Sequence, residues 1–324
     1  MKIKNLNSSI AKQTSVNISF SINRNYLLFC FVTINSLLKN NPNSFFNIYI
    51  QHNNCITEAD VNTFTNQFPL KNFRNFKILL LDMSTVGELS EIADGGKWTK
   101  EVYFKLFLPN LLPNEDKILY LDADVAVLGN IDNFLNQNMK EHIFCGDKFG
   151  GRLNCGVMLI NLNLAREKNI HKEIFTKIKD QYFKDRSDFY KLTEEYVINT
   201  FFPEQITYYE DIITLGSKNH NLTNKNYKIV HYLGIKPWHL DRKIPKNIKP
   251  LYVSYLSNLK EFSKNKALTT LVFYYLLYGG YFINNVTRRI KNSIYKNIFK
   301  IPKYKYLHKG LTMAFFIKNS ISPK

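Results

Sequence analysis

The chain has 324 residues, of which 45% are hydrophobic and 22% charged, a composition that excludes a mainly disordered protein. Its formal net charge is +18, but residues 242–324 hold 17 basic residues and one acidic residue, whereas residues 1–241 hold 27 and 25. A near-neutral body with a basic tail argues against a nucleic-acid groove through the body. It favours a tail that meets a polyanionic surface.

Cysteine content and the N-terminus limit the cellular compartment. The four cysteines are too few and too scattered for a disulfide framework, and none forms a CxxC pair. The first 15 residues include basic side chains but no apolar run, which argues against a cleaved secretory leader. These two features predict a cytoplasmic protein.

The first 165 residues alternate short β-rich runs with helix-like runs. The expected order of strand, helix, strand, helix, strand, helix and strand has the ranges 16–22, 26–38, 45–50, 57–67, 76–81, 99–108 and 117–121. Pro109 is expected to end the third helix. The repetition predicts an α/β fold with a mainly parallel sheet and right-handed crossovers. Ligands of such sheets bind beyond the carboxyl ends of the strands, so the residues after each strand are the candidates for chemistry.

Two aspartates, Asp122 and Asp124, follow the apolar strand at 117–121. On an extended backbone this spacing places both side chains on one side, because side chains alternate with a period of two residues. Two carboxylates on one side suit a hard divalent cation such as Mg²⁺ or Mn²⁺, which can bridge the phosphates of a nucleotide. The alternative interpretations are a solvated strand end and a helix N-cap at Asp124.

The context of the aspartates resembles a known family. The string KILYLDADV at 117–125, preceded by Leu-Pro pairs at 108–109 and 112–113, is similar to glycosyltransferase family 8, the bacterial lipopolysaccharide hexosyltransferases and their glycogenin relatives. Three further segments match that family in the same order: ISFSINRNY at 18–26, LNCGVMLINL at 153–162 and HYLGIKPWH at 231–239. The resemblance covers about residues 15–240. It implies a single Rossmann-like nucleotide-sugar-binding domain of GT-A type at 15–241, after an N-terminal extension at 1–14.

The resemblance also implies the binding residues. The metal ligands would be Asp122, Asp124 and His231, with a core or loop histidine as the alternative for His231. The UDP-sugar would contact Ile22, Asn23, Asn25, Tyr26, Lys105, Asp122, Ala123, Asp124, Asn154, Cys155, Gly156, His231, Gly234 and Lys236. Asn23 stands where the family usually has Asp, Lys105 where it often has Arg, and Cys155 where Ala is commoner. The spacing from Gly234 to Lys236 is one residue shorter than usual.

The catalytic candidates implied by the resemblance are Asn154, Glu194 and Glu195. Glu194 matches an acidic residue that binds the donor sugar, and Glu195 stands where related enzymes have Gln at the reacting face. The alternative for this pair is a helix N-terminal turn capped by Thr193, where acids favour the helix dipole. Asp147 is a further donor-sugar candidate. The family retains anomeric configuration, either through a covalent carboxylate intermediate or by front-face attack, and Glu195 leaves both routes open.

The expected function is therefore a retaining hexosyltransferase. It would move glucose or galactose from a UDP-sugar, with Mn²⁺ or Mg²⁺, to a hydroxyl of a cell-surface glycan or glycolipid such as lipopolysaccharide, lipooligosaccharide or capsule. Two alternatives stay open at this point. One is metal-dependent nucleotidyl or phosphoryl transfer, although the chain has no P-loop. The other is a non-catalytic basic protein that binds membrane or nucleic acid on the same fold.

The basic region at 242–324 is expected to be helical and to bind an anionic membrane. Ile290, Ile294, Ile298 and Ile301 recur at helical spacing among basic residues, as in an interfacial helix. The charge-free stretch at 267–287 is long enough to span a bilayer. Gly and Asn in its second half favour instead a segment that packs on the body of the protein or lies in the membrane interface. The expected location is the cytoplasmic face of the inner membrane. A solvated basic tail is the alternative.

Overall fold

The computed structural model describes residues 4–5, 15–67, 69–91, 99–184, 193–216, 226–237, 244 and 247–262. The chain divides into two compact units. The first comprises Met1–Thr214 and Lys225–His231, and the second comprises Leu215–Asn224 and Tyr232–Lys324. The division into an extension at 1–14, a domain at 15–241 and a tail at 242–324 stays a prediction.

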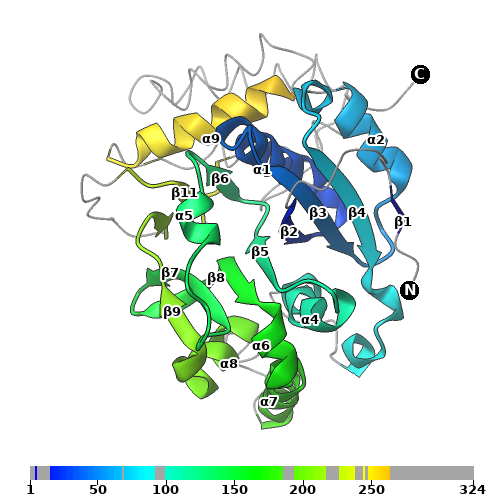
Figure 1. The fold of residues 1–324 in the computed structure, drawn as a ribbon, viewed down its shortest axis with the longest axis vertical. Helices are drawn as coiled ribbons and strands as arrows, with labels where there is room; N and C mark the ends of the chain where they lie inside the picture. Colours follow the sequence, from blue (N-terminus) through cyan, green and yellow to red (C-terminus); the bar gives the residue numbers. More distant parts are fainter. Residues whose placement is uncertain are drawn as a thin grey trace, which may run out of the picture. The chain divides into compact units, whose positions relative to one another are not determined.

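The first unit is built on an eight-stranded mixed sheet (Figure 1). Its strands, in spatial order, are β1 (Lys4–Asn5), β4 (Phe76–Asp82), β3 (Phe45–His52), β2 (Ser15–Ser21), β5 (Lys117–Leu121), β8 (Arg152–Asn161), β7 (Phe144–Phe149) and β9 (Ile206–Tyr208). Strands β4, β3, β2 and β5 are parallel, whereas β8 runs antiparallel to both β5 and β7. This mainly parallel α/β arrangement confirms the expected fold class.

A second, three-stranded sheet joins distant parts of the same unit. Its order is β10 (Ile212–Thr214), β11 (Ile229–His231) and β6 (Val125–Val127). Strand β11 is antiparallel to β6, which pairs His231 with Val125. This pairing brings the end of β11 to the segment that follows β5, although about a hundred positions separate them in sequence.

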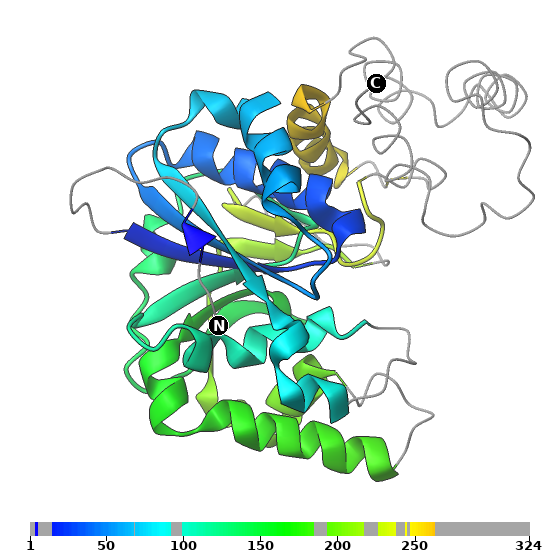
Figure 2. The same cartoon turned by 90° about the vertical axis from the view of Figure 1, so that its right-hand side faces the viewer.

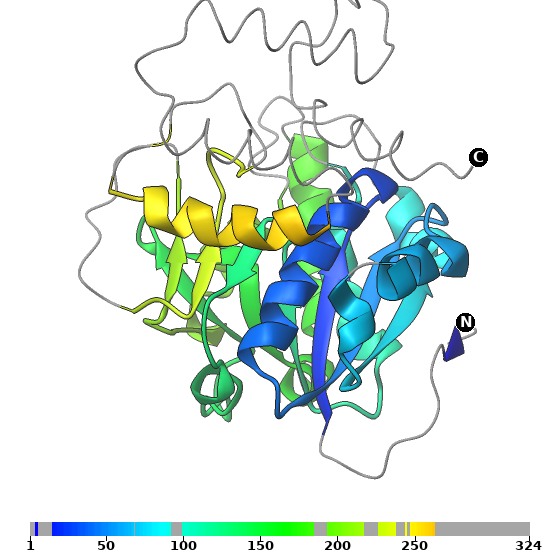
Figure 3. The ribbon, with the colours of Figure 1, turned by 90° about the horizontal axis from the view of Figure 1, so that it is seen from above.

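Helices cover both faces of the large sheet. Figures 2 and 3 place α1 (Leu27–Asn40) and α2 (Glu58–Gln67) on one face. The opposite face packs in one apolar core with α3 (Glu101–Phe104), α4 (Leu108–Leu111), α6 (Leu162–Glu167), α7 (Ile170–Lys184) and α8 (Glu194–Phe201). Helix α1 is buried from Leu27 to Leu38, as its almost entirely apolar sequence predicts.

The remaining helical segments are short. They are η1 (Arg24–Tyr26), η2 (Pro69–Asn72), η3 (Met83–Thr85), η4 (Gly87–Glu91), η5 (Lys105–Phe107), α5 (Asp132–Leu135) and η6 (Pro203–Gln205). The predicted end of a helix at Pro109 is wrong, because Pro109 lies in the first turn of α4. Proline is tolerated there, since the first turn of a helix needs no partner for its N–H.

The second unit contains α9 (Lys249–Glu261). The Tyr232 ring meets the rings of Tyr252 and Tyr255 edge-on, at centroid distances of 4.9 and 5.4 Å. The hydroxyl of Tyr252 also donates to the carbonyl oxygen of Ile235 at 2.6 Å. No helix within the described ranges has the length and apolar character to cross a membrane. The expected membrane segments at 267–287 and 290–301 lie outside those ranges.

Candidate active site

The two aspartates occupy the turn that joins β5 to β6. Asp122 follows Leu121 directly, and Ala123 and Asp124 form a turn before Val125. The extended backbone predicted for this tripeptide is therefore wrong. The side chains converge because the chain turns from one sheet into the other. The hydroxyl of Thr33 on α1 holds this turn through the carbonyl oxygens of Ala123 and Val125, at 3.0 and 2.7 Å.

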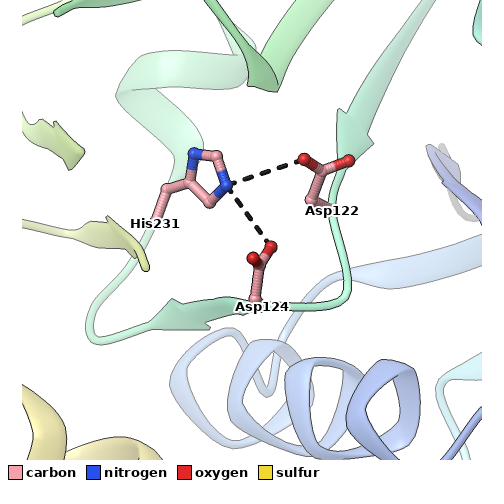
Figure 4. Close-up of side chains that lie close together, drawn as sticks. All are labelled: Asp122, Asp124 and His231. Atoms are coloured by element: carbon pink, nitrogen blue, oxygen red, sulfur yellow. Dashed lines mark ion pairs between the residues drawn. The ribbon is translucent and has the colours of Figure 1, made fainter. Parts of the chain in front are cut away.

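The structure brings His231 to both aspartates (Figure 4). Its Nε2 lies 3.3 Å from Oδ1 of Asp124 and 3.6 Å from Oδ2 of Asp122. The three side chains offer ligand atoms that all lie within 4.8 Å of one another. The Asp122 side chain is 35% exposed, whereas those of Asp124 and His231 are 9% and 2% exposed. The cluster therefore opens to solvent on the Asp122 side.

A hydrogen-bond network assigns the tautomer of His231. The side-chain oxygen of Asn154 accepts from the backbone N–H of Gly156 at 3.2 Å, and its amide nitrogen donates to Glu195 at 3.1 Å. These two bonds fix which end of the amide is oxygen. That oxygen lies 2.7 Å from Nδ1 of His231, so Nδ1 must carry a proton. Nε2, which faces the aspartates, is then the nitrogen available to a metal ion.

The arrangement depends on Gly156 of β8, where the His231 ring and the Asp122 carboxylate come close to the backbone. A Cβ atom at position 156 would lie 2.2 Å from Cε1 of His231 and 2.7 Å from Oδ2 of Asp122. The carbonyl oxygen of Gly156 also accepts from the backbone N–H of Asp122 at 2.7 Å. Only glycine leaves room for the imidazole and the carboxylate at the same place.

A divalent metal ion fits the cluster. Two carboxylates and a neutral imidazole nitrogen form a donor set for hard divalent cations. An unprotonated Nε2 points its lone pair at the negative charge of two carboxylate oxygens, which is unfavourable. A metal ion among the three groups would balance that charge. Asp122, Asp124 and His231 are thus the residues that would hold the ion.

Lys105 and Glu194 form a buried ion pair beside the cluster. The Lys105 ammonium donates to Glu194 at 2.7 Å and to the carbonyl oxygen of Cys155 at 3.2 Å. Burial acts to lower the pKa of Lys105, but the charges of Glu194, Tyr120, Asp122 and Cys155 together outweigh it, with Glu194 the largest of these, so the pKa is raised well above the usual lysine range. A lysine in a short helical segment could equally have been an exposed surface residue, but the Lys105 side chain is only 4% exposed.

Glu195 lies beside this pair, in the first turn of α8. One of its oxygens accepts from the side chain of Asn154 and, at 3.0 Å, from the backbone N–H of Cys155. Burial raises the pKa of Glu195, against the hydrogen bond from Cys155, and the Glu194 charge adds to the increase. Thr193 caps the helix by accepting from the N–H of Tyr196 at 3.2 Å. The capping interpretation therefore holds here together with the contact to Asn154.

The loop after β2 opens at the same sheet edge as Asp122, because β2 is parallel to β5. Ile22 is buried, and its N–H donates to the carbonyl oxygen of Gln51 at 3.0 Å. Asn23 begins η1 by accepting from the N–H of Asn25 at 3.0 Å. Tyr26 is 41% exposed. The loop thus presents amide groups and one aromatic ring, while its contact with a nucleotide stays a prediction.

Gly234 and Lys236 belong to the second unit. The N–H of Gly234 donates to the carbonyl oxygen of Leu215 at 2.9 Å. The ammonium of Lys236 donates to the carbonyl oxygens of Tyr232 and Leu233, at 2.9 and 3.3 Å. This lysine therefore turns back on its own loop, and its contact with a diphosphate stays a prediction.

Asp147, the further donor-sugar candidate, lies in β7. Its carboxylate accepts from the N–H of Thr214 at 2.7 Å, and burial raises its pKa. Thr214 pairs with His231 between β10 and β11. Asp147 thus links β7 to β10, the strand that pairs with the one carrying His231. Its contact with a sugar stays a prediction.

Sequence reasoning missed three residues that shape the site. Thr33 stands out as a polar residue in an apolar helix, which could have marked it. Tyr120, two residues before Asp122, donates its hydroxyl to that carboxylate at 2.7 Å, and the shared strand face could have indicated the contact. Asn199 joins α8 to β8 through both backbone groups of Leu153, at 2.8 and 2.9 Å.

Comparisons with known proteins agree with this geometry. The model of Glycosyl transferase family 8 matches residues 17–242. A lipopolysaccharide 1,3-galactosyltransferase of Salmonella typhimurium is 24% identical over 261 residues, which cover 69% of this chain and 73% of the relative. A lipopolysaccharide 1,2-glucosyltransferase of Escherichia coli K12 is 25% identical over 276 residues, which cover 74% and 76%.

Solved structures share the fold. The galactosyltransferase LgtC, in complex with donor and acceptor sugar analogs, matches with a TM-score of 0.56 at 17% identity. The match covers 85% of this chain and 99% of that one. At this identity the likeness establishes the fold alone, and it agrees with the expected GT-A type.

Proposed function

The chain belongs to glycosyl transferase family 8 and is a hexosyltransferase, and on that premise we propose that its donor is a UDP-hexose bound with Mn²⁺. The observation that carries this proposal is the convergence of Asp122, Asp124 and His231. Oxygen ligands with one imidazole suit Mn²⁺ better than Mg²⁺, which prefers an all-oxygen shell. The bound ion would neutralise charge that develops on the departing diphosphate.

The residues around the cluster divide the remaining work. We assign the nucleoside to Ile22, Asn23, Asn25 and Tyr26, whose loop follows β2 at the sheet edge used by ligands in such folds. Asn amides can donate to and accept from a base and a ribose, and the exposed Tyr26 ring offers a stacking surface.

The donor sugar would lie against β8 and the first turn of α8. Asn154 and Glu195 are hydrogen-bonded to each other there, so their groups are fixed before a substrate arrives. Glu194 is held by Lys105. Fixed dipoles and charges of this kind favour a transition state because they need no reorganisation during the reaction.

We propose a cell-surface glycan of the lipopolysaccharide type as acceptor, with glucose or galactose as the transferred hexose. Support comes from the curated relatives, a lipopolysaccharide 1,3-galactosyltransferase and a lipopolysaccharide 1,2-glucosyltransferase. The basic region at 242–324 supports a peripheral location at the cytoplasmic face of the inner membrane. Nucleotidyl transfer and a non-catalytic role have no comparable support.

A donor screen tests the proposal. UDP-glucose, UDP-galactose and other UDP-hexoses are incubated with the full chain and Mn²⁺, and release of UDP is measured. We expect hydrolysis or transfer with one or two donors, its loss with EDTA, and its return when Mn²⁺ is added in excess. Undiminished turnover in EDTA would refute the metal role, and turnover with none of the donors would refute the donor class.

A further inference from the structure

The outer shell of the cluster contains a tyrosine to which neither the sequence nor the family resemblance gave a role. We infer that Tyr120 is a positioning residue of the metal site, which holds Asp122 so that one defined carboxylate oxygen faces the ion. The inference rests on the proposed metal-dependent function. It adds a residue that itself touches neither metal nor substrate.

The contact is direct. The Tyr120 hydroxyl donates to Oδ1 of Asp122 at 2.7 Å, while Oδ2 of the same carboxylate lies 3.6 Å from Nε2 of His231. Figure 4 shows the two oxygens of Asp122 turned to different sides, one of them toward His231. Asp122 directly follows Leu121, the last residue of β5, so its carboxylate lies within reach of Tyr120 on that strand.

Asp122 needs such a contact more than Asp124 does. Its side chain is 35% exposed, against 9% for Asp124. Rotation about the terminal torsion of an aspartate has a broad profile, so exposure alone leaves the carboxylate free to turn. The backbone N–H of Asp122 is fixed by Gly156, but that bond does not select an oxygen. The phenol makes that selection.

Tyr120 is itself held rigidly. Its ring is buried, and the ammonium of Lys105 lies 4.2 Å from the ring centroid. Lys105 is fixed in turn by Glu194 and by the carbonyl oxygen of Cys155. The hydroxyl therefore has a position set by the core, which a group that orients a metal ligand through a hydrogen bond requires.

A competing interpretation is that the bond only satisfies a buried phenol. In that case removal of the hydroxyl lowers stability and leaves metal affinity unchanged. The chain offers a control with the same spacing of two residues, in which the hydroxyl of the half-buried Tyr209 donates to Asp211 at 3.2 Å. Neither Tyr209 nor Asp211 belongs to the cluster.

The experiment compares the full-length wild type, Tyr120→Phe and Tyr209→Phe. Mn²⁺ affinity is measured in the presence of UDP by calorimetry and by the EPR signal of free Mn²⁺, and the metal-free proteins are melted in parallel. We expect about tenfold weaker Mn²⁺ binding in Tyr120→Phe, the lower end of the losses seen when a hydrogen-bond partner of a metal ligand is removed, and no change in Tyr209→Phe. Raising Mn²⁺ should restore the turnover of Tyr120→Phe.

The outcomes separate the two proposals. A wild type that binds no Mn²⁺ overturns the metal site itself. A wild type that binds Mn²⁺, with equal affinity in Tyr120→Phe, overturns only the positioning role, whether or not the metal-free melting temperature falls. An equal loss of affinity in Tyr209→Phe also overturns it, since the effect would not be specific to the cluster.

Discussion

Two groups of charged residues lie beside the carboxyl end of β5, and they are neutralised in different ways. In the first, Lys105 and Glu194 are buried and bonded to each other at 2.7 Å, so the protein supplies both charges. In the second, Asp122 and Asp124 face an imidazole nitrogen that carries no fixed charge. The first group is a complete ion pair, whereas the second places two carboxylates beside one imidazole, where a bound metal ion would balance the negative charge.

The two groups are therefore expected to differ in role: the ion pair stabilises the fold, and the cluster binds the ligand. A buried ion pair that loses one partner leaves an uncompensated charge in the core, so its mutation is expected to act on folding. A carboxylate in the partly open cluster lies close to another carboxylate and is repelled by its negative charge. Its neutralisation is expected to spare the metal-free fold and to abolish ligand binding.

The largest effect is expected from Asp122→Asn. It should reduce transfer by about three powers of ten, since a metal ion supplies several kcal/mol of transition-state stabilisation. The metal-free melting temperature should be unchanged or raised. Asp116→Asn is the matched control, because Asp116 lies at the other end of β5, exposed and bonded to the side chain of Asn163. Near-normal turnover in Asp122→Asn, or equal losses in both variants, would contradict the assignment.

The next effect is on stability. Lys105→Met leaves Glu194 buried without its cation and should cost about 3–5 kcal/mol of unfolding free energy, measured by urea denaturation. The double variant Lys105→Met/Glu194→Gln removes both charges and should recover most of that loss. If the single and double variants are equally unstable, the cost lies in packing around the lysine stem, and the charge of the pair does not distinguish it from the cluster.

Much of this arrangement was predictable from the sequence. The strand at 117–121 appears with the predicted bounds, because an apolar run between charged residues is a strong pattern for a buried strand. The convergence of His231 with the aspartates was expected only from the resemblance to family 8. Local patterns carry no information on it, since the pairing of β11 with β6 joins segments far apart in the chain.

What the sequence could not give is the state of each charged group. Lys105 stands in a segment whose sequence favours a helix with an exposed lysine, and it is buried by contacts with Tyr120 on β5, Cys155 on β8 and Glu194 on α8. The turn at Asp122–Asp124 was likewise hidden, because the tripeptide contains no glycine or proline to mark it. In both cases tertiary contacts outweigh local preference.

Gly156 tests how closely the cluster is packed. Gly156→Ala would place a methyl carbon 2.2 Å from the His231 ring, and overpacking of this kind costs about 1–3 kcal/mol. We expect a lower melting temperature and weaker Mn²⁺ binding in the same variant. Gly87→Ala is the control, because a Cβ there meets nothing within 4 Å. Full Mn²⁺ affinity in Gly156→Ala would show that His231 can move aside without loss, and the cluster would then be less rigid than its contacts indicate.

The smallest effect is the pH dependence contributed by Glu195, an acid on the Glu194 side of the site. Burial raises the pKa of Glu195 in the folded protein, whereas the unfolded chain ionises at its ordinary value of about 4.3. Between these two values the folded state binds more protons than the unfolded state, so the contribution of this group to stability falls as pH rises.

Glu195→Gln keeps an acceptor for Asn154 and Cys155 but does not titrate. Unfolding free energies measured from about pH 4 to about pH 7 should therefore show the wild type losing stability relative to Glu195→Gln as the pH increases. A difference that is constant across this range would mean that Glu195 ionises alike in the folded and unfolded states, because the hydrogen bonds from Asn154 and Cys155 offset its burial.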